Sequence, residues 1–122
     1  MSSRPILAPQ LVITNASMTT TVTSLVTVVQ TNGKLSYDIS WTGTPVGTFT
    51  VQASNTYSQN ADGTVRNPGD WATLTLSAPT TASGSAGNGF IDITATAAYA
   101  LRLQYTPSSG TGTLNATVAG KV

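Results

Sequence analysis

The segment Leu35–Thr42 constrains the fold most, because apolar and polar residues alternate in it without a break. Its apolar positions are Leu35, Tyr37, Ile39 and Trp41. Successive side chains of a β-strand point to opposite faces, so these four residues would share one buried face. A helix would spread them around its circumference. The pattern therefore predicts a strand with one face in a core.

Similar patterns recur along the chain and predict about eight strands. They cover residues 5–14, 19–30, 35–42, 49–53, 71–77, 90–94, 99–105 and 114–118. Turn sequences rich in Gly, Pro and Asn separate them, and no stretch has a convincing helical period. The run 19–30 is β-branched almost throughout, which is typical of a strand buried on both faces. The sequence thus predicts an all-β chain that folds as an antiparallel, jelly-roll-like β-sandwich.

A chain of 122 residues fits one domain. We expect residues 19–122 to form the sandwich, and residues 1–18 to form either an N-terminal arm or an edge strand. Two prolines favour both interpretations, because proline restricts a segment to a sheet edge or an extended conformation. As an arm, the segment would dock on a partner by strand pairing or in a groove. The candidate contact residues in it are Arg4, Pro5, Ile6, Leu7 and Pro9.

Tyr57 is the other candidate contact residue. It lies in the long polar connection 55–70, where no strand pattern requires its burial. An exposed aromatic residue in a loop is suited to contact a partner. The alternative is that its ring packs within the loop.

The composition excludes several classes of function. Charged residues make up 7% of the chain, with five Lys+Arg against four Asp, and the chain contains neither His nor Cys. A metal site would need oxygen ligands alone, and triads with His or Cys are impossible. The scattered cations make no basic stripe for nucleic acid, and no apolar run is long enough to span a membrane. We therefore expect no catalytic residues, no metal and no cofactor.

The four aspartates have ordinary structural explanations. Asp62 and Asp70 share one loop with two asparagines, which are potential calcium ligands, but turn chemistry explains all four residues better. Asp38 and Asp92 lie on the polar sides of expected strands. We expect them to face solvent or to pair with Arg102.

Two segments and the Trp71 region between them resemble small all-β virion proteins of tailed bacteriophages. The segments are WTGTPVGTFTVQAS at 41–54 and LRLQYTPSSGTGTL at 101–114. The resemblance covers residues 35–121 and implies a structural protein of the particle, in the first place a capsid decoration (cement) protein. As partners it implies the major capsid protein or neighbouring virion subunits, with a homo-oligomer (trimer or dimer) on the capsid surface. Synthesis would take place in the cytoplasm of the bacterial host.

Three other roles are weighed beside this one. A tail or spike component belongs to the same structural class. A carbohydrate-binding or host-recognition module would need a cluster of exposed aromatic residues, whereas Tyr37, Trp41 and Tyr99 follow the apolar phase of their strands and are expected in the core. An enzyme is not expected, because no motif assembles the remaining Asp, Ser, Lys and Tyr residues.

Overall fold

The computed structural model describes residues 6–28, 34–74, 80–94 and 99–121, and within these ranges it contains strands and no helix. The strands are β1 (Ile6–Ser17), β2 (Val22–Thr23), β3 (Thr27–Val28), β4 (Lys34–Gly43), β5 (Val46–Ser54), β6 (Ser58–Gln59), β7 (Val65–Asn67), β8 (Ala72–Thr73), β9 (Thr80–Ser83), β10 (Gly87–Thr94), β11 (Ala100–Ser109) and β12 (Gly112–Lys121). The predicted all-β fold is confirmed.

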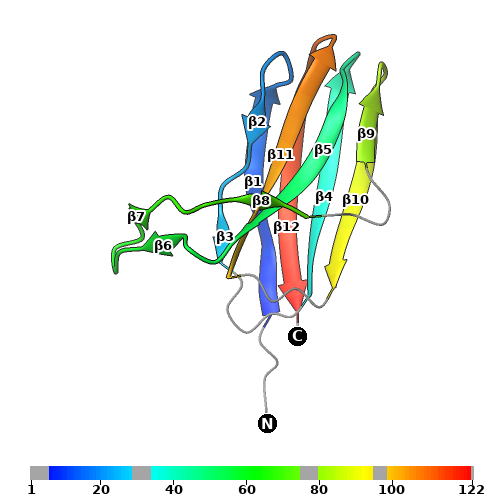
Figure 1. Ribbon diagram of the computed structural model, residues 1–122. Coiled ribbons are helices and arrows are strands. Elements are labelled where there is room, and N and C mark those ends of the chain that lie inside the picture. The colour runs from blue at the N-terminus through cyan, green and yellow to red at the C-terminus, as the bar shows by residue number, and fades with distance from the viewer. Residues whose placement is uncertain (1–5, 29–33, 75–79, 95–98, 122) are drawn as a thin grey trace.

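Two antiparallel sheets face each other in the sandwich (Figure 1). The first sheet has the order β1-β12-β4-β10. The second has the order β2-β11-β5-β8, in which β3 also pairs with β11 and β9 with β5. If β2 and β3 are counted as one interrupted strand, and β8 and β9 as another, the two sheets contain eight strands in jelly-roll order. These correspond to the eight strands expected from the sequence. The number of separate strands is larger because two of them are interrupted and β6 and β7 form a further hairpin.

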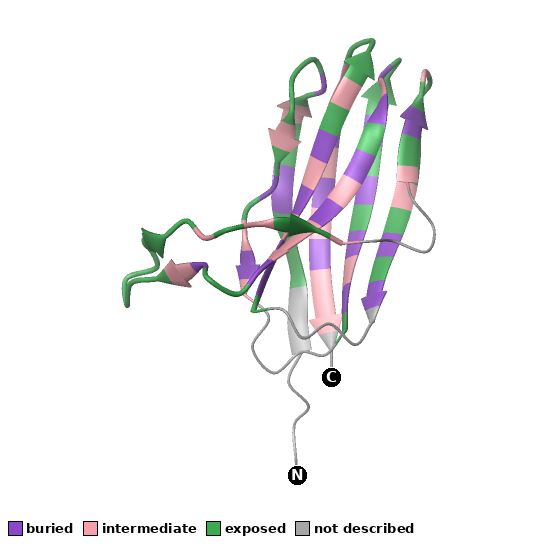
Figure 2. Cartoon of the chain, in the orientation of Figure 1, coloured by how far each residue is buried: buried purple, intermediate pink, exposed green. Residues whose placement is uncertain are grey.

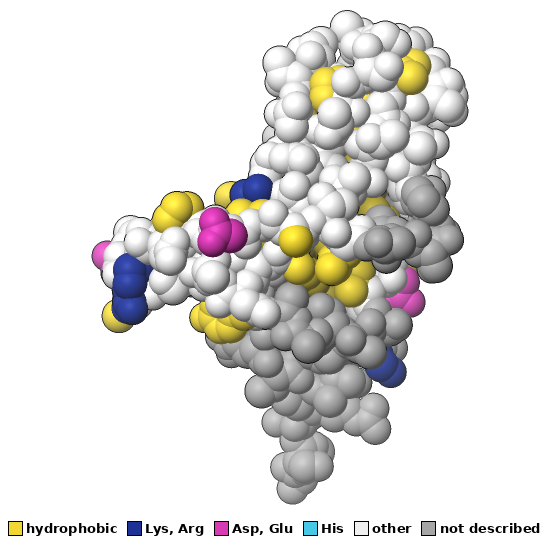
Figure 3. Space-filling view, viewed as in Figure 1, with side chains coloured by type: hydrophobic (Ala, Val, Ile, Leu, Met, Phe, Trp, Pro, Cys, Tyr) yellow, Lys and Arg dark blue, Asp and Glu magenta, His cyan; other side chains and the backbone are white. Residues whose placement is uncertain are grey.

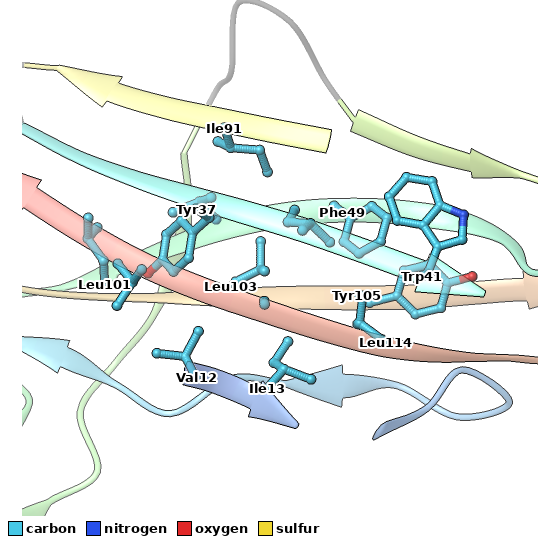
Figure 4. Close-up of a cluster of buried hydrophobic side chains, with 14 of the residues drawn as sticks. Val12, Ile13, Tyr37, Trp41, Phe49, Ile91, Leu101, Leu103, Tyr105 and Leu114 are labelled. Atoms are coloured by element: carbon cyan, nitrogen blue, oxygen red, sulfur yellow. The ribbon is translucent and has the colours of Figure 1, made fainter. Parts of the chain in front are cut away.

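The core lies between the sheets and follows the alternation in the sequence. In β4 the buried positions are the four predicted ones, Leu35, Tyr37, Ile39 and Trp41. Residues of β5 and β11 meet them from the second sheet, and β1, β10 and β12 contribute further aliphatic side chains (Figure 4). The ring of Phe49 joins the two sheets, with its centroid 5.2 Å from that of Trp41 and 4.8 Å from that of Tyr105.

The prediction of one buried strand over residues 19–30 is wrong for the described residues 19–28. Only β2 and β3 form there, and Leu25 between them is 68% exposed. The interruption has a clear cause in the side chain of Ser24, whose Oγ accepts a hydrogen bond from the backbone of Leu103 and donates one to the carbonyl of Leu25. Leu25 N–H then bonds to Val12 O in the first sheet. The pairing with β11 is thus interrupted at Leu25, whose N–H bonds to the first sheet, and resumes at β3, so two short strands form in place of a continuous one.

Two other expectations also need correction. Tyr99 is 44% exposed instead of buried, because β11 begins one residue later and the N–H of Tyr99 bonds to Asn55 Oδ1. The sequence also predicts a polar, flexible connection over residues 78–89, but residues 80–83 and 87–89 belong to β9 and β10. Pairing with β5 and β4 along their whole length orders these small polar residues.

Candidate interaction site

The N-terminal candidates lie at the edge of the first sheet. Arg4 and Pro5 are outside the described residues, whereas Ile6, Leu7 and Pro9 belong to β1, which pairs with β12. The register shifts around Pro9, where the backbone lacks an N–H donor. Of the two interpretations of this segment, the structure shows the edge strand from residue 6 onward. The middle of β1 also supplies two side chains to the core.

Tyr57 is buried, with 5% of its surface exposed. Its ring packs against Trp71, with 5.9 Å between the ring centroids, and its hydroxyl accepts a hydrogen bond from Gln59 Nε2 at 2.9 Å. Tyr57 is therefore not an exposed contact residue. The loop folds back on itself and brings the indole against the tyrosine ring, so the alternative of packing within the loop describes its position.

The loop that contains Tyr57 is an ordered projection, which we call the arm (residues 55–71). It leaves the second sheet after β5 and returns to it at β8, and its outer part is the β6–β7 hairpin (Figure 1). The hairpin projects well beyond the sandwich, and most of its residues are exposed (Figure 2). The hairpin of the arm is thus accessible to a partner.

Polar side chains fix the tip of the arm. Asp62 Oδ1 accepts hydrogen bonds from the N–H and the hydroxyl of Thr64, at 3.0 and 2.6 Å. These bonds favour the charged carboxylate and lower the pKa of Asp62. Asn60 Nδ2 donates to Thr64 Oγ1, and Asn60 Oδ1 accepts a bond from Arg66 Nε. The tip is therefore held in one shape before any partner binds.

An aromatic and cationic stack connects the arm to the second sheet. Trp71 Nε1 donates to the carbonyl of Pro68 at 2.8 Å, and the guanidinium carbon of Arg102 lies 4.3 Å from the centroid of the Trp71 ring. Arg102 Nε donates to Gln52 Oε1 at 2.7 Å on the neighbouring strand. Partial burial lowers the pKa of Arg102 from its ordinary value, since desolvation disfavours the cation. Cation–π stacking at such a partly desolvated site stabilises the attachment of the arm.

Gly69 allows the returning end of the arm to pack closely against the residues where the arm leaves β5. Its φ of +79° lies in the left-handed region, where glycine is favoured. A Cβ atom at this position would lie 2.7 Å from Ser54 Oγ and 2.8 Å from Tyr57 N. Ser54 Oγ in turn accepts the N–H groups of Thr56 and Tyr57. The close approach of these backbones thus depends on the missing side chain.

The aspartates do not come together. The described residues contain no group of three or more Asp, Glu, His or Cys side chains that could hold a metal ion. Asp38 and Asp92 are exposed on the first sheet, whereas Arg102 belongs to the second. The expected pairing with Arg102 is therefore wrong, while the alternative of facing solvent describes both residues.

The surface offers limited aromatic area for a sugar. Trp41 and Tyr57 are buried, Arg102 lies over the ring of Trp71, and Tyr99 is exposed. A shallow depression of about 310 Å³ lies near Tyr99, lined by Ala53, Ser54, Asn55, Asp70 and Ala72. No flat platform of stacked rings is present in the described part of the chain.

Most of the surface in view carries no charge, and several of the charged side chains lie on the arm and at its base (Figure 3). No helix in the described ranges is long and apolar enough to cross a membrane. Models of known protein families and the sequences of curated proteins gave no match to this chain.

Proposed function

We propose that the protein is a structural component of a virus particle: a capsid decoration protein of a tailed bacteriophage that binds the shell of the major capsid protein. The observation that carries the proposal is the arm. It contributes little to the core between the sheets, yet hydrogen bonds fix its tip and an aromatic stack fixes its base. An ordered projection binds with a smaller entropic cost than a flexible one, which suits attachment to a repetitive surface.

Two further features support the proposal. Residues 35–121 resemble small all-β phage virion proteins, and the jelly roll is an architecture that capsid domains use among others. The sandwich surface is polar but almost uncharged, with a formal net charge of +1 for the chain. Neutral hydrogen bonds are less sensitive to salt than ion pairs, and a low net charge limits repulsion between copies that stand close together.

The test is the composition of purified particles from the phage that encodes the chain. We expect the protein at a fixed ratio to the shell subunit after salt washes, measured by quantitative mass spectrometry. Absence from washed particles, or a ratio that varies between preparations, would refute the proposal.

A pair of variants then tests the role of the arm. Val65 is 54% exposed in β7, and Leu25 is 68% exposed outside the arm. With stripped particles and added protein, we expect Val65→Asp to reduce occupancy at least about tenfold, as loss of an interface anchor does, and Leu25→Asp to bind normally. Equal binding by both variants would show that the arm is not the attachment element.

A further inference from the structure

The two sheets of the sandwich have four edges, and three of them carry features that prevent pairing with another chain. In the second sheet, one edge consists of β2 and β3 with two residues each, and the other of β8 and β9 with two and four residues. In the first sheet, β1 contains Pro9, and its register with β12 shifts three times. Short edge strands, prolines and bulges are the usual means by which proteins block their sheet edges.

The fourth edge, β10, lacks these features. It pairs with β4 over eight consecutive residues without a register shift, and its sequence contains no Pro, Lys or Arg (Figure 1). Gly87 is exposed and Gly89 is half-buried, and since glycine has no side chain, this exposed surface is backbone. A regular edge with accessible backbone is a template for a further strand. Of the four edges, β10 is therefore the one at which strand addition is expected.

The sequence of β10 is complementary to itself around Phe90. Asn88, Phe90 and Asp92 alternate with buried isoleucines and are exposed on the outer face of the sheet, where Phe90 is 63% exposed. We propose that two copies of the chain pair antiparallel through β10, with Phe90 opposite Phe90 of the other copy. A two-fold axis perpendicular to the sheet relates the copies, and their first sheets form one continuous sheet. Such a contact is isologous and closes as a dimer.

The side chains that meet on the outer face are compatible in this register. Two Phe90 rings meet at the axis, and cross-strand aromatic pairs stabilise antiparallel strands. On each side of the axis, Asn88 of one copy lies opposite Asp92 of the other. The amide can donate a hydrogen bond to the carboxylate, so the charged residue of β10 gains a partner at the interface.

The inner face is compatible as well. Gly89 of one copy lies opposite Ile91 of the other, and Gly87 lies opposite Ile93. The two isoleucines are already buried within their own copy. Because each bulky residue stands beside a glycine, no two large side chains compete for the same space.

Charge favours this register over its neighbours. A register centred on Asp92 would bring two carboxylates together, which opposes association, and one centred on Ile91 would place Phe90 against Asp92. With Phe90 at the centre, the two copies of Asp92 are about 14 Å apart, and so are the two copies of Asp38, which pairs with Phe90 on β4. Lys34 lies at the far end of β4, so its two copies are farther apart still. No like charges are therefore in contact.

The contact involves one strand of each copy, so we expect a dimer that dissociates on dilution. The arm leaves the sandwich on the side opposite β10, so it stays accessible in the dimer (Figure 1). The pairing is a property of the isolated protein and does not depend on the virion role.

Cysteine cross-linking tests the register directly, because the chain has no cysteine of its own. We expect Phe90→Cys to form a disulfide dimer on oxidation, since directly opposed Cα atoms are about 4.5–5.5 Å apart. Asn88→Cys should not cross-link alone, because its copies are about 14 Å apart, but it should cross-link when mixed with Asp92→Cys. Leu11→Cys is the matched control: Leu11 is 58% exposed on the other edge of the sheet and should stay monomeric. Equal cross-linking of Phe90→Cys and Leu11→Cys, or cross-linking of Asn88→Cys alone, would overturn the proposed pairing.

Sedimentation equilibrium with two substitutions of Asn88 tests the association itself. Asn88→Asp would oppose two like-charge pairs across the axis, so the dissociation constant should rise at least about tenfold. Asn88→Lys would place a cation opposite Asp92, so the constant should fall several-fold. The net charge of the chain is +1, and these substitutions change it to about 0 and about +2, so non-specific repulsion would have the opposite effect. Shifts in the same direction, or a protein that stays monomeric at millimolar concentration, would refute the dimer, and neither result would bear on particle binding.

Discussion

The hydroxyl of Tyr105 is buried in the core, and no residue that the structure describes forms a hydrogen bond with it. The ring packs against Phe49, and a methyl group on Gly47 would lie 2.5 Å from Tyr105 Oη. In the unfolded chain water bonds to this hydroxyl, so burying it unpaired costs about 1–3 kcal/mol. Replacing Tyr105 by Phe keeps the ring contacts and removes this cost. We therefore expect Tyr105→Phe to stabilise the protein.

The size of the gain follows from two opposing effects. Removal of the unpaired hydroxyl contributes about 1–3 kcal/mol, and the void left by one oxygen atom costs about 0.5 kcal/mol. The free energy of unfolding should thus rise by about 1 kcal/mol or somewhat more, and Tm by about 3–5 °C for a chain of this length. Urea titration followed by tryptophan fluorescence measures the change, and an unchanged m-value shows that compactness is unaltered.

Tyr57→Phe is the matched control for this experiment. The hydroxyl of Tyr57 accepts a hydrogen bond from Gln59, so its removal should destabilise the protein by about 0.5–1.5 kcal/mol. The two substitutions remove the same atom and should have opposite signs. If Tyr105→Phe lowered the stability by more than about 1 kcal/mol, the hydroxyl would have a bonding partner, such as an internal water, and the reasoning would be refuted.

Three further predictions address the core, alkaline pH and the arm. Trp41→Ala should lower the free energy of unfolding by about 3–5 kcal/mol, because it removes a buried aromatic ring; a loss below about 1 kcal/mol would contradict its central position. Burial raises the pKa of Tyr37 and of Tyr105, so the free energy of unfolding should be constant up to about pH 10, where unfolded tyrosines ionise. Above that pH it should fall by up to about 1.4 kcal/mol per pH unit for each residue. Urea midpoints measured between pH 8 and 12 should show this slope, and a flat profile would contradict it. Gly69→Ala should loosen the arm, because φ is +79° at this position and alanine is disfavoured there. Trypsin should then cleave after Arg66 at least several-fold faster. An unchanged rate would show that the arm does not depend on this glycine.

The four long central strands were predictable because each alternates large apolar with polar residues. In β4 and β11 this alternation identified the strand and its buried face, apart from Tyr99. The strand ends were less predictable. The pattern indicated 49–53 and 114–118, whereas β5 spans Val46–Ser54 and β12 spans Gly112–Lys121. Backbone pairing continues wherever a neighbouring strand is present, including positions where Gly or Thr gives no apolar signal.

Residues 19–28 could not be assigned from their composition. A run of β-branched residues indicates strand propensity, but propensity does not say where the pairing with a neighbouring strand is interrupted. The interruption depends on Ser24, whose hydroxyl bonds to Leu103 far along the sequence, and on the bond from Leu25 N–H to Val12 in the opposite sheet. Such long-range hydrogen bonds leave no local pattern, so a single continuous strand was predicted in place of two short ones.

The structure of the arm could not be predicted from the sequence for a similar reason, although one turn sequence pointed to it. Asn67-Pro68-Gly69-Asp70 is a strong turn sequence that directly precedes Trp71. A turn at that point reverses the chain and brings Trp71 back towards Tyr57, so that the two rings bury each other and Arg102 covers the indole. Arg102 is bonded to Gln52, and Gln52 is linked through Gln104 to Thr23, so these contacts continue across the outer face of the second sheet. The arm and this face are thereby held in a fixed relative orientation, and a partner that binds the arm meets both as one rigid surface.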